Sequence, residues 1–274
     1  MVMKKKFTKM HGLGNDYIYF NCFDEEFSDA SKQAAGLSDR NTGIGGDGIV
    51  LIERSSAADA KMVMFNIDGS EGAMCGNAIR CVARFLFDEG LVKKDIMTIE
   101  TKSGVKKLWL EGDVIRVDMG RPVFAKSETN KKDSITEKIV VDKKDYDITK
   151  ISMGNPHAVV FVDEAAKVDL KTVGPKFEYH KAFMPDRVNT EFVQVLDRKN
   201  LVMRVWERGS GETKACGTGA CASVVAAVLE GKCDINTDVV VSLDGGDLII
   251  NYTGDTVFMT GTATKVFEGE IEIK

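Results

Sequence analysis

The sequence predicts a chain of two similar halves, in each of which β-strands surround one helix. Three observations lead to this prediction. A cysteine-centred phrase occurs twice, as GSEGAMCGNAIRC over residues 69–81 and as GSGETKACGTGAC over residues 209–221. A helix pattern follows each copy. Short strand patterns bounded by turn residues fill much of the remaining chain.

Further matches support a duplication. Asn15 follows a glycine and recurs as Asn155, at an offset of 140 residues, and Cys75 recurs as Cys216 at an offset of 141. Between them, the string DRNT loosely resembles DRVNT in the second half. Because the matches keep their order and their offsets are close to half of 274 residues, we interpret the chain as two homologous halves.

A polar segment divides the two halves. AKSETNKKDSITEK, residues 125–138, has no apolar periodicity and indicates a surface linker or an edge hairpin. We therefore expect one domain over residues 1–120 and another over residues 121–261. The strand-like KVFEGEIEIK at the end of the chain is expected to pair with the first half, so residues 262–274 are assigned to the first domain.

The remaining elements follow from apolar patterns and turn signals. The expected strands cover residues 18–20, 49–52, 108–110, 114–117, 157–162, 191–196 and 201–206, and residues 239–261 indicate an antiparallel meander. The expected helices run from Asn77 to Glu89 and from Thr218 to Glu230, each followed by a glycine as a stop signal. Because the second helix is apolar nearly all round, we expect strands to enclose it.

Composition excludes several classes of function. The chain is 43% hydrophobic and 29% charged, as in ordinary globular proteins, and its net charge of −5 offers no basic surface for nucleic acid. The longest run of apolar and small residues, ACASVVAAVL, is too short to cross a membrane, and no secretory signal pattern is present. Six irregularly spaced cysteines predict neither a disulfide framework nor a metal site, which favours a reducing cytoplasm.

One glycine-rich string resembles a nucleotide-binding fingerprint. GIGGDG, residues 43–48, fits the pattern G-x-G-x-x-G, but polar SDRNT precedes it and strand-like IVLIE follows it. A dinucleotide site needs the reverse order, with a strand before the string and a helix after it. The string therefore predicts a tight turn.

Each cysteine of the repeated phrase stands at the entrance of a predicted helix. A glycine and a polar residue follow both Cys75 and Cys216, so both sulfur atoms are expected beside unpaired backbone N–H groups. This end of a helix favours anions and can lower the pKa of a thiol from about 8.5 into a range of roughly 3.5–7.5. The same N–H groups can hold a substrate carboxylate. The phrases predict two reactive thiols that face one carbon atom.

A single cysteine in such a place is more often a small residue that packs the start of a helix. The duplication favours the functional interpretation, because packing gives no reason to keep Cys-Gly followed by Asn or Thr in both halves. Cys22 and Cys233 lack this setting and are expected to be structural. Cys81 and Cys221 lie on the helices and are expected in the core.

Taken together, these motifs resemble the diaminopimelate epimerase family. The resemblance rests on GNDY, NIDGSEGAMCGNAIRC, SMGNPH and ERGSGETKACGTGA, which begin at residues 14, 66, 152 and 207. It implies an α+β fold of two pseudo-symmetric halves, each a mixed β-sheet rolled around a central α-helix, with the active site in the cleft between them. Related proline and hydroxyproline racemases normally carry His where this chain has Asn77, which favours the diaminopimelate branch.

The resemblance implies interconversion of LL- and meso-2,6-diaminopimelate in lysine and peptidoglycan precursor biosynthesis, without pyridoxal phosphate or another cofactor and without a metal. Cys75 and Cys216 would be the acid–base pair, one removing the α-proton and the other donating to the opposite face. The implied partner is a small amino-acid substrate, with no nucleic acid and no membrane; association into a homodimer stays open. The implied substrate contacts are Asn15, Asn66, Gly76, Asn77, Asn155, Asn189, Glu207, Arg208, Gly217 and Thr218, and His157 would support the charge balance around the thiols.

Two positions depart from the family pattern. Ala78 stands where a second glycine usually follows Cys-Gly-Asn, and it is expected to crowd the start of the helix. Gly48 stands where some members have a glutamine that contacts the substrate, so one contact is missing. The missing contact bears on substrate affinity and not on the type of reaction, and the effect of Ala78 and Gly48 on that affinity stays open.

Two other functions stay open from the residues alone. A non-catalytic binding protein would keep the cleft, although retention of both Cys75 and Cys216 counts against it. A thiol–disulfide redox protein would turn over with a dithiol reductant, whereas a disulfide would inactivate an epimerase.

Overall fold

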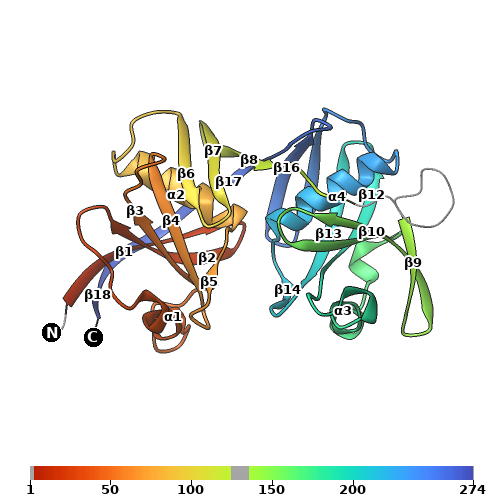
Figure 1. Ribbon diagram of the computed structural model, residues 1–274, viewed down its shortest axis with the longest axis horizontal. Coiled ribbons are helices and arrows are strands. Elements are labelled where there is room, and N and C mark those ends of the chain that lie inside the picture. The colour runs from red at the N-terminus through yellow and green to blue at the C-terminus, as the bar shows by residue number, and fades with distance from the viewer. Residues whose placement is uncertain (1–2, 125–135, 274) are drawn as a thin grey trace. The chain divides into compact units, whose positions relative to one another are not determined.

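The computed structural model describes residues 3–124 and 136–273, which form two compact units. Residues 1–117 and 261–274 make up the first unit, and residues 118–260 the second. Both ends of the colour scale of Figure 1 therefore lie in the first unit. The predicted halves, residues 1–120 with 262–274 and residues 121–261, remain our proposal for the duplicated segments.

The first unit is built mainly of strands, with two α-helices. Its elements are β1 (Met3–Gly12), β2 (Asn15–Cys22), α1 (Ala30–Ser38), β3 (Gly48–Glu53), β4 (Ala60–Asn66), β5 (Glu71–Gly72), α2 (Gly76–Asp88), β6 (Ile96–Thr101), β7 (Gly104–Glu111), β8 (Val114–Gly120) and, from the end of the chain, β18 (Thr264–Ile273). β18 pairs with β1 in antiparallel register, which confirms the predicted return of the last strand. β2 pairs with β3 and β4 with β6 in parallel, and the other neighbouring strands are antiparallel.

The second unit repeats this plan. Its elements are β9 (Thr136–Val141), β10 (Lys144–Ser152), β11 (Pro156–Phe161), the short 3-10 helix η1 (Ala165–Lys167), α3 (Leu170–Glu178), the 3-10 helix η2 (Lys181–Phe183), β12 (Asn189–Asp197), β13 (Asn200–Glu207), β14 (Gly211–Thr213), α4 (Gly217–Leu229), β15 (Asp238–Leu243), β16 (Gly246–Tyr252) and β17 (Val257–Thr262). β11 pairs with β12 and β13 with β15 in parallel, as β2 with β3 and β4 with β6. The duplication read from the sequence is therefore a duplication of topology.

A buried helix lies at the centre of each unit. α2 packs against β1, β2, β6 and β7, and α4 packs against strands from β10 to β16 (Figure 1). α4 begins and ends within one residue of the predicted limits, and its residues from Ala220 to Ala227 are buried. α4 is apolar on all sides, and strands surround it on most sides, because only this enclosure removes all of its apolar side chains from water. The predicted mixed sheet around a central helix is confirmed.

A second, shorter helix covers the other face of each sheet. Along β2, Ile18 and Phe20 pack into a cluster with Ala34 and Leu37 of α1, whereas the hydroxyl group of Tyr19 approaches the backbone of α2. Alternate residues of a strand point to opposite faces, so α1 and α2 lie on opposite sides of this strand. α3 has the same place in the second unit, where its Leu170 and Phe177 enter an apolar cluster. The sequence patterns do not predict α1 and α3.

Most other expected elements are confirmed. β15, β16 and β17 form the expected antiparallel meander. The expected strand over residues 157–162 begins and ends one residue earlier, as β11. The string GIGGDG follows α1, and its last residue, Gly48, begins β3, so the string leads from a helix into a strand, as its interpretation as a turn requires. Of the expected linker over residues 125–138, only residues 136–138, the start of β9, lie within the described residues.

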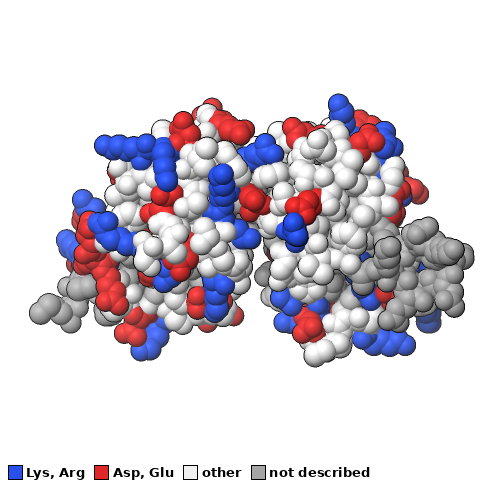
Figure 2. All heavy atoms as spheres, turned by 45° about the horizontal axis from the view of Figure 1, so that its top comes forward, with Lys and Arg blue, Asp and Glu red and all other residues white. Residues whose placement is uncertain are grey.

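Charged side chains of both signs mix on one face of each unit. On the face shown in Figure 2, Lys and Arg side chains lie among Asp and Glu side chains in each unit. Within the described ranges, no helix is long and apolar enough to cross a membrane.

Replacement of Gly48 by alanine should destabilise the first unit, because a Cβ atom there would lie 2.1 Å from the backbone oxygen of Phe65 on the paired strand. Such crowding costs about 1–3 kcal/mol. Urea unfolding of Gly48→Ala would measure the loss of free energy of unfolding. Gly36→Ala is the control: Gly36 lies in α1 with no atom within 4 Å of an added Cβ, so this variant should gain up to about 1 kcal/mol. Equal stability of Gly48→Ala and wild type would contradict the expected crowding.

Candidate active site

Both cysteines of the repeated phrase stand directly before the central helices. Cys75 is the N-cap residue of α2 and Cys216 is the N-cap residue of α4, and both have extended backbone angles, with φ of −131° and −120°. Each backbone carbonyl accepts the first helical hydrogen bond, from Ile79 and Ala220. The repeated phrase therefore produces the same local structure twice, with a thiol beside the first turn of a buried helix.

In the first unit, the Cys75 thiol contacts the side chain of Asn15. Sγ donates to Oδ1 of Asn15 at 3.3 Å, and Asn15 is the first residue of β2. Gly76 and Asn77 begin α2 and are buried, and Oδ1 of Asn77 accepts from the guanidinium group of Arg80 at 3.0 Å. The remaining predicted residue of this half, Asn66, ends β4 and donates through Nδ2 to Ser70 at 3.1 Å.

In the second unit, hydrogen bonds connect Cys216 to a buried histidine. The Cys216 sulfur lies 3.5 Å from Oγ1 of Thr218, which accepts from Nδ2 of Asn155 at 3.2 Å. Oδ1 of Asn155 lies 3.0 Å from Nε2 of His157, and Nδ1 of His157 lies 2.6 Å from Oε1 of Glu191. His157 and Glu191 are fully buried. The histidine therefore lies between two oxygen atoms that orient its ring.

The end of β13 supplies a carboxylate and an arginine. Glu207 is the last residue of β13, and its carboxylate accepts from the hydroxyl group of Thr213 and interacts with the Cys216 thiol. The backbone N–H of Arg208 donates to Oδ1 of Asn189 at 2.9 Å, and its guanidinium group donates to the backbone oxygen of Asp186 at 2.8 Å. Gly217 is the first residue of α4 and is buried. In the second unit, short contacts thus connect Cys216 with Thr218, Asn155, His157 and Glu207, and a separate contact connects Asn189 with Arg208.

The electrostatic setting of Cys216 contradicts the pKa expected from its helix position. Burial raises the pKa of the Cys216 thiol well above its ordinary value, and the negative charges of Glu207 and Glu191 raise it further. Hydrogen bonds from Thr218 and from the backbone of Gly219 act in the opposite direction but are weaker. Burial also raises the pKa of Glu207. The prediction of a lowered thiol pKa is wrong for Cys216 because it counted the helix end and omitted desolvation and two carboxylates.

The other cysteines lie as expected from their positions. Cys81 and Cys221 are fully buried on α2 and α4. Burial raises the pKa of Cys81 to about 11 and that of Cys22 to about 11. Cys233 is also buried. None of these four cysteines is an N-cap residue of a described α-helix.

Ala78 is fully buried in the core at the start of α2, and its counterpart at the same place in α4 is Gly219. The crowding expected from Ala78 stays a prediction. A Cβ atom on Gly219 would lie 2.7 Å from Oε1 of Glu191, whereas the position of Glu191 is occupied by Val50 in the first half, as the strand registers show. The difference between alanine and glycine therefore follows from which side chain the facing strand carries.

Several polar residues of this region are not among the predicted site residues. Arg80 is fully buried in α2 and donates to the backbone oxygens of Gly76 and Thr262. Glu191 pairs with His157, and Asp47 accepts from Asn15. A charged residue inside an apolar pattern, such as Arg80 in its helix or Glu191 in its strand, is a sequence signal that could have indicated the first two. Asp47 lies in a polar turn and gives no such signal.

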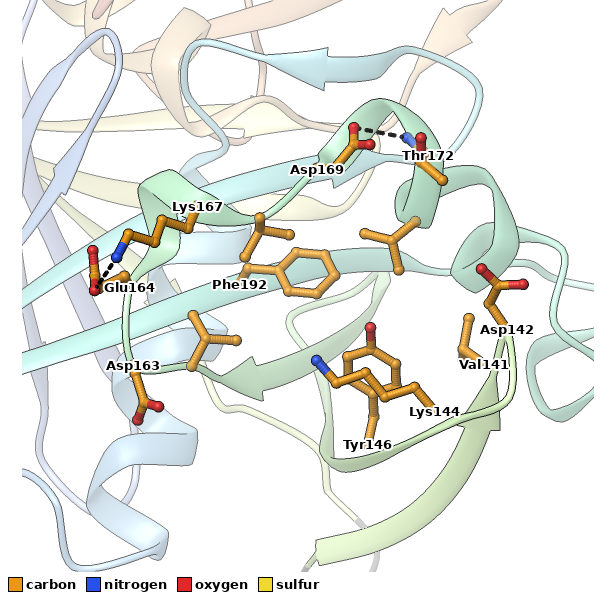
Figure 3. A pocket seen from close by; sticks show the side chains of 13 residues that line it. Val141, Asp142, Lys144, Tyr146, Asp163, Glu164, Lys167, Asp169, Thr172 and Phe192 are labelled. Carbon is orange, nitrogen blue, oxygen red and sulfur yellow. Dashed lines mark hydrogen bonds and ion pairs between the residues drawn. The ribbon is translucent and has the colours of Figure 1, made fainter.

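A separate pocket lies at the outer helix of the second unit. It has a volume of about 500 Å³, and none of the predicted site residues lines it. In Figure 3, Phe192 and Tyr146 form its apolar floor, and Lys144 lies over the Tyr146 ring at 5.0 Å. At the rim, Lys167 pairs with Glu164 at 2.7 Å. The pocket is thus distinct in its residues from the groups around Cys216.

A comparison of this sequence with known protein families agrees with the duplicated structure. The family described as "Diaminopimelate epimerase" matches residues 7–125 and 149–266, which include both cysteine phrases and most of both units. The chain belongs to the diaminopimelate epimerase family.

Curated relatives match the chain over nearly its whole length. A diaminopimelate epimerase from Acetivibrio thermocellus is 50% identical over 279 residues, which cover 98% of this chain and 99% of that protein. One from Agathobacter rectalis is 49% identical over 286 residues, again covering 98% of this chain and 99% of that protein.

Solved structures extend the likeness of the fold beyond this family. A PhzF-family phenazine biosynthesis protein of Bacillus anthracis has a TM-score of 0.75 at 19% identity, covering 99% of this chain and 100% of that one. A hydroxyproline epimerase of Agrobacterium vitis has a TM-score of 0.71 at 14% identity, covering 98% of this chain and 93% of that one. At these identities the likeness concerns the fold, which is the expected α+β fold of two pseudo-symmetric halves.

The raised pKa of Cys216 predicts a loss of stability at alkaline pH. A thiol whose pKa is higher in the folded chain stabilises that chain below the pKa of the unfolded thiol, about 8.5, and this contribution is lost as the pH rises. The advantage in unfolding free energy of wild type over Cys216→Ala should therefore shrink between pH 8 and pH 10, by at most about 1.4 kcal/mol per pH unit. Urea unfolding under reducing conditions measures it.

Val224→Ala is the control for this measurement, because Val224 is fully buried in the same helix and does not titrate. Its difference from wild type should stay constant with pH. A constant difference for Cys216→Ala as well would show that its thiol titrates normally in the folded chain.

Proposed function

We propose that this protein interconverts LL- and meso-2,6-diaminopimelate by proton transfer at the α-carbon, with Cys75 and Cys216 as the two acid–base groups. The observation that carries the proposal is the equivalent position of the two thiols, each at the N-cap of the buried helix of its unit. Inversion of a carbon centre needs an acceptor on one face and a donor on the other. A duplicated fold supplies two equivalent groups for these two roles.

In the proposed reaction the two cysteines differ in protonation. One thiolate takes the α-proton while the other thiol donates a proton to the opposite face, so each sulfur is base in one direction and acid in the reverse direction. Burial and two carboxylates favour the protonated form of Cys216. Because the thiols would interact through the substrate, their protons leave in two coupled steps that belong to the pair.

We assign the reacting carboxylate of the substrate to the two helix entrances. The backbone N–H groups after each cysteine point out of the first turn of the helix, and Gly76, Asn77, Gly217 and Thr218 carry them. These groups would stabilise the negative charge that the carboxylate gains when the α-proton leaves. Because the helices are already fixed in the core, no reorganisation is needed when that charge develops.

The polar ends of the substrate are assigned to the remaining side chains. Asn15, Asn66, Asn155, Asn189 and Arg208 would hold them, and the Glu207 carboxylate would accept from a substrate ammonium group. Asn189 fixes the backbone of Arg208, which supports a positioning contribution of this asparagine. His157 would hold Asn155 in place through the contact at 3.0 Å. The proposed setting is lysine and peptidoglycan precursor biosynthesis in the cytoplasm.

Incubation of the reduced chain with LL-diaminopimelate in deuterated water, without added cofactor, tests the proposal. Deuterium should enter the α-carbon of the meso product, because the donor thiol exchanges its proton with solvent. NMR or mass spectrometry of the amino acid follows the label. If no label enters substrate or product, the chain does not catalyse this reaction.

The two thiols can be tested separately in the same assay. Cys75→Ala and Cys216→Ala should each lose at least about 100-fold in epimerisation rate, the usual contribution of an acid–base group. Cys81→Ala and Cys221→Ala remove buried thiols from the same helices and should keep turnover as long as they fold. Normal rates for either N-cap variant would remove that cysteine from the mechanism.

A further inference from the structure

The carboxamide group of Asn15 contacts one residue through its oxygen and another through its nitrogen. Its Oδ1 accepts from the Cys75 thiol at 3.3 Å, and its Nδ2 donates to Oδ2 of Asp47 at 2.7 Å. A carboxylate only accepts hydrogen bonds, so Asp47 must face the NH₂ end of the amide. The oxygen end is then the one that faces Cys75.

Asp47 itself is held in place from two sides. Its Oδ2 also accepts from the backbone N–H of Asp16 at 3.1 Å, and its Oδ1 accepts from Nη2 of Arg40 at 2.9 Å. The backbone N–H of Asp47 donates in turn to the backbone oxygen of Asp16 at 2.7 Å. The carboxylate is therefore held by one backbone group and one guanidinium group, and the backbone of Asp47 is paired with that of Asp16.

Asp16 anchors the same arrangement to the interior of the unit. Arg40 donates to both oxygens of its carboxylate, at 3.2 and 2.7 Å, and the buried Lys9 ammonium group forms an ion pair with it. Burial alone would raise the pKa of Asp16, but hydrogen bonds from Arg40 and Lys9 outweigh burial and lower it. Asp16 thus stays charged at neutral pH and keeps Arg40 beside Asp47.

We propose that Asp47 is a positioning residue that holds the Asn15 amide with its oxygen toward the Cys75 sulfur and thereby favours the thiol form of Cys75 over the thiolate. Oδ1 can accept the S–H proton but cannot donate to a sulfur anion, whereas the NH₂ end could donate to it. Release of the amide would therefore let it rotate and stabilise the thiolate. The consequence for turnover rests on the proposed function, but the effect on Cys75 does not.

The second half fixes its corresponding asparagine by other means. Asn155 contacts Nε2 of His157 through Oδ1 and Thr218 through Nδ2. Ile49 pairs with Phe65 as Thr190 pairs with Trp206, which places Val188 at the position of Asp47. The amide of Asn15 thus contacts a carboxylate directly, whereas the amide of Asn155 reaches the carboxylate of Glu191 through His157.

The titratable groups beside Cys75 in its own unit are neutral at pH 7 and do not interfere with a measurement of Cys75 ionisation. Tyr19 of β2 and Cys81 of α2 interact with it electrostatically. Burial raises the pKa of Tyr19 well above its ordinary value and that of Cys81 to about 11, so both stay neutral at pH 7. Asp47, Asp16 and Arg40 are the charged groups that reach Cys75 through Asn15.

Alkylation of Cys75 against pH, measured by mass spectrometry of its peptide in the full-length chain, tests the proposal. Asp47→Ala frees the amide and should lower the alkylation midpoint of Cys75 by about 0.5–1 pH unit, which raises its thiolate fraction below the midpoint about 3–10-fold. Asp47→Asn is the matched variant, since it removes the same charge but keeps a carbonyl oxygen for Asn15. It should retain most of the wild-type midpoint. Equal shifts in the two variants would assign the effect to charge and overturn the proposal.

Two further variants complete the experiment. Asp24→Ala removes an exposed aspartate that pairs with Arg54 at 2.6 Å, and it should leave the Cys75 midpoint unchanged. Asp47→Ser truncates the side chain in a polar form and replaces Asp47→Ala if that chain does not fold by circular dichroism. A folded truncation variant with the wild-type midpoint would show that Asp47 does not control the amide. Because alkylation needs no substrate, its outcome is independent of the deuterium experiment on the proposed function.

Discussion

Burial of the central helix in each unit is the constraint on which the rest of the structure depends. A helix enclosed by strands on most sides can neither tilt nor slide without losing apolar contacts, so the position of its first turn is fixed. The first turn presents backbone N–H groups at the helix entrance, and the residue just before it is a cysteine in both units. The rigid core thus decides where each thiol and its neighbouring N–H groups lie.

The two units share this backbone but surround their cysteines with different chemistry. At positions equivalent in strand register, the first unit carries Asn66 and Val50, and the second carries Glu207 and Glu191. The neutral residues leave Cys75 beside an amide, whereas the carboxylates add negative charge around Cys216. A symmetric fold therefore surrounds its two sulfur atoms with unequal charge. An inversion that needs one acceptor and one donor is compatible with such inequality.

Regular and repeated features could be predicted from the sequence. The central helices begin and end within one residue of their predicted limits, because an apolar pattern and a terminal glycine define them. The outer helices α1 and α3 could not be predicted in this way, since each has nine residues and contains a helix-weakening residue, Gly36 or Pro175. Contacts between residues that are far apart in the sequence could not be predicted either. Asp47 meets Asn15 across 32 residues, and nothing in its own neighbourhood indicates the contact.

The direction in which the pKa of Cys216 shifts could not be predicted from the local sequence either. Local sequence revealed the helix end that stabilises a thiolate, but the burial of the sulfur and the approach of Glu191 arise only when β12 packs beside α4. Long-range packing can thus reverse an electrostatic effect that short-range sequence predicts. The position of each cysteine at a helix entrance could be predicted from the repeated phrase, whereas the charge balance around Cys216 could not.

The contact between Gly219 and Glu191 bears on how a duplicated gene can diverge. With a carboxylate on β12, a Cβ atom at residue 219 would lie 2.7 Å from Oε1 of Glu191, so that side chain would have to shift, whereas the first half, with Val50 in the matching strand, carries Ala78. The residue that suits the start of each central helix therefore depends on the facing strand of the same copy. A hybrid chain with the Ala78 helix in the second half would displace Glu191, which contacts His157, so the two repeats are not freely interchangeable although their backbones follow one plan.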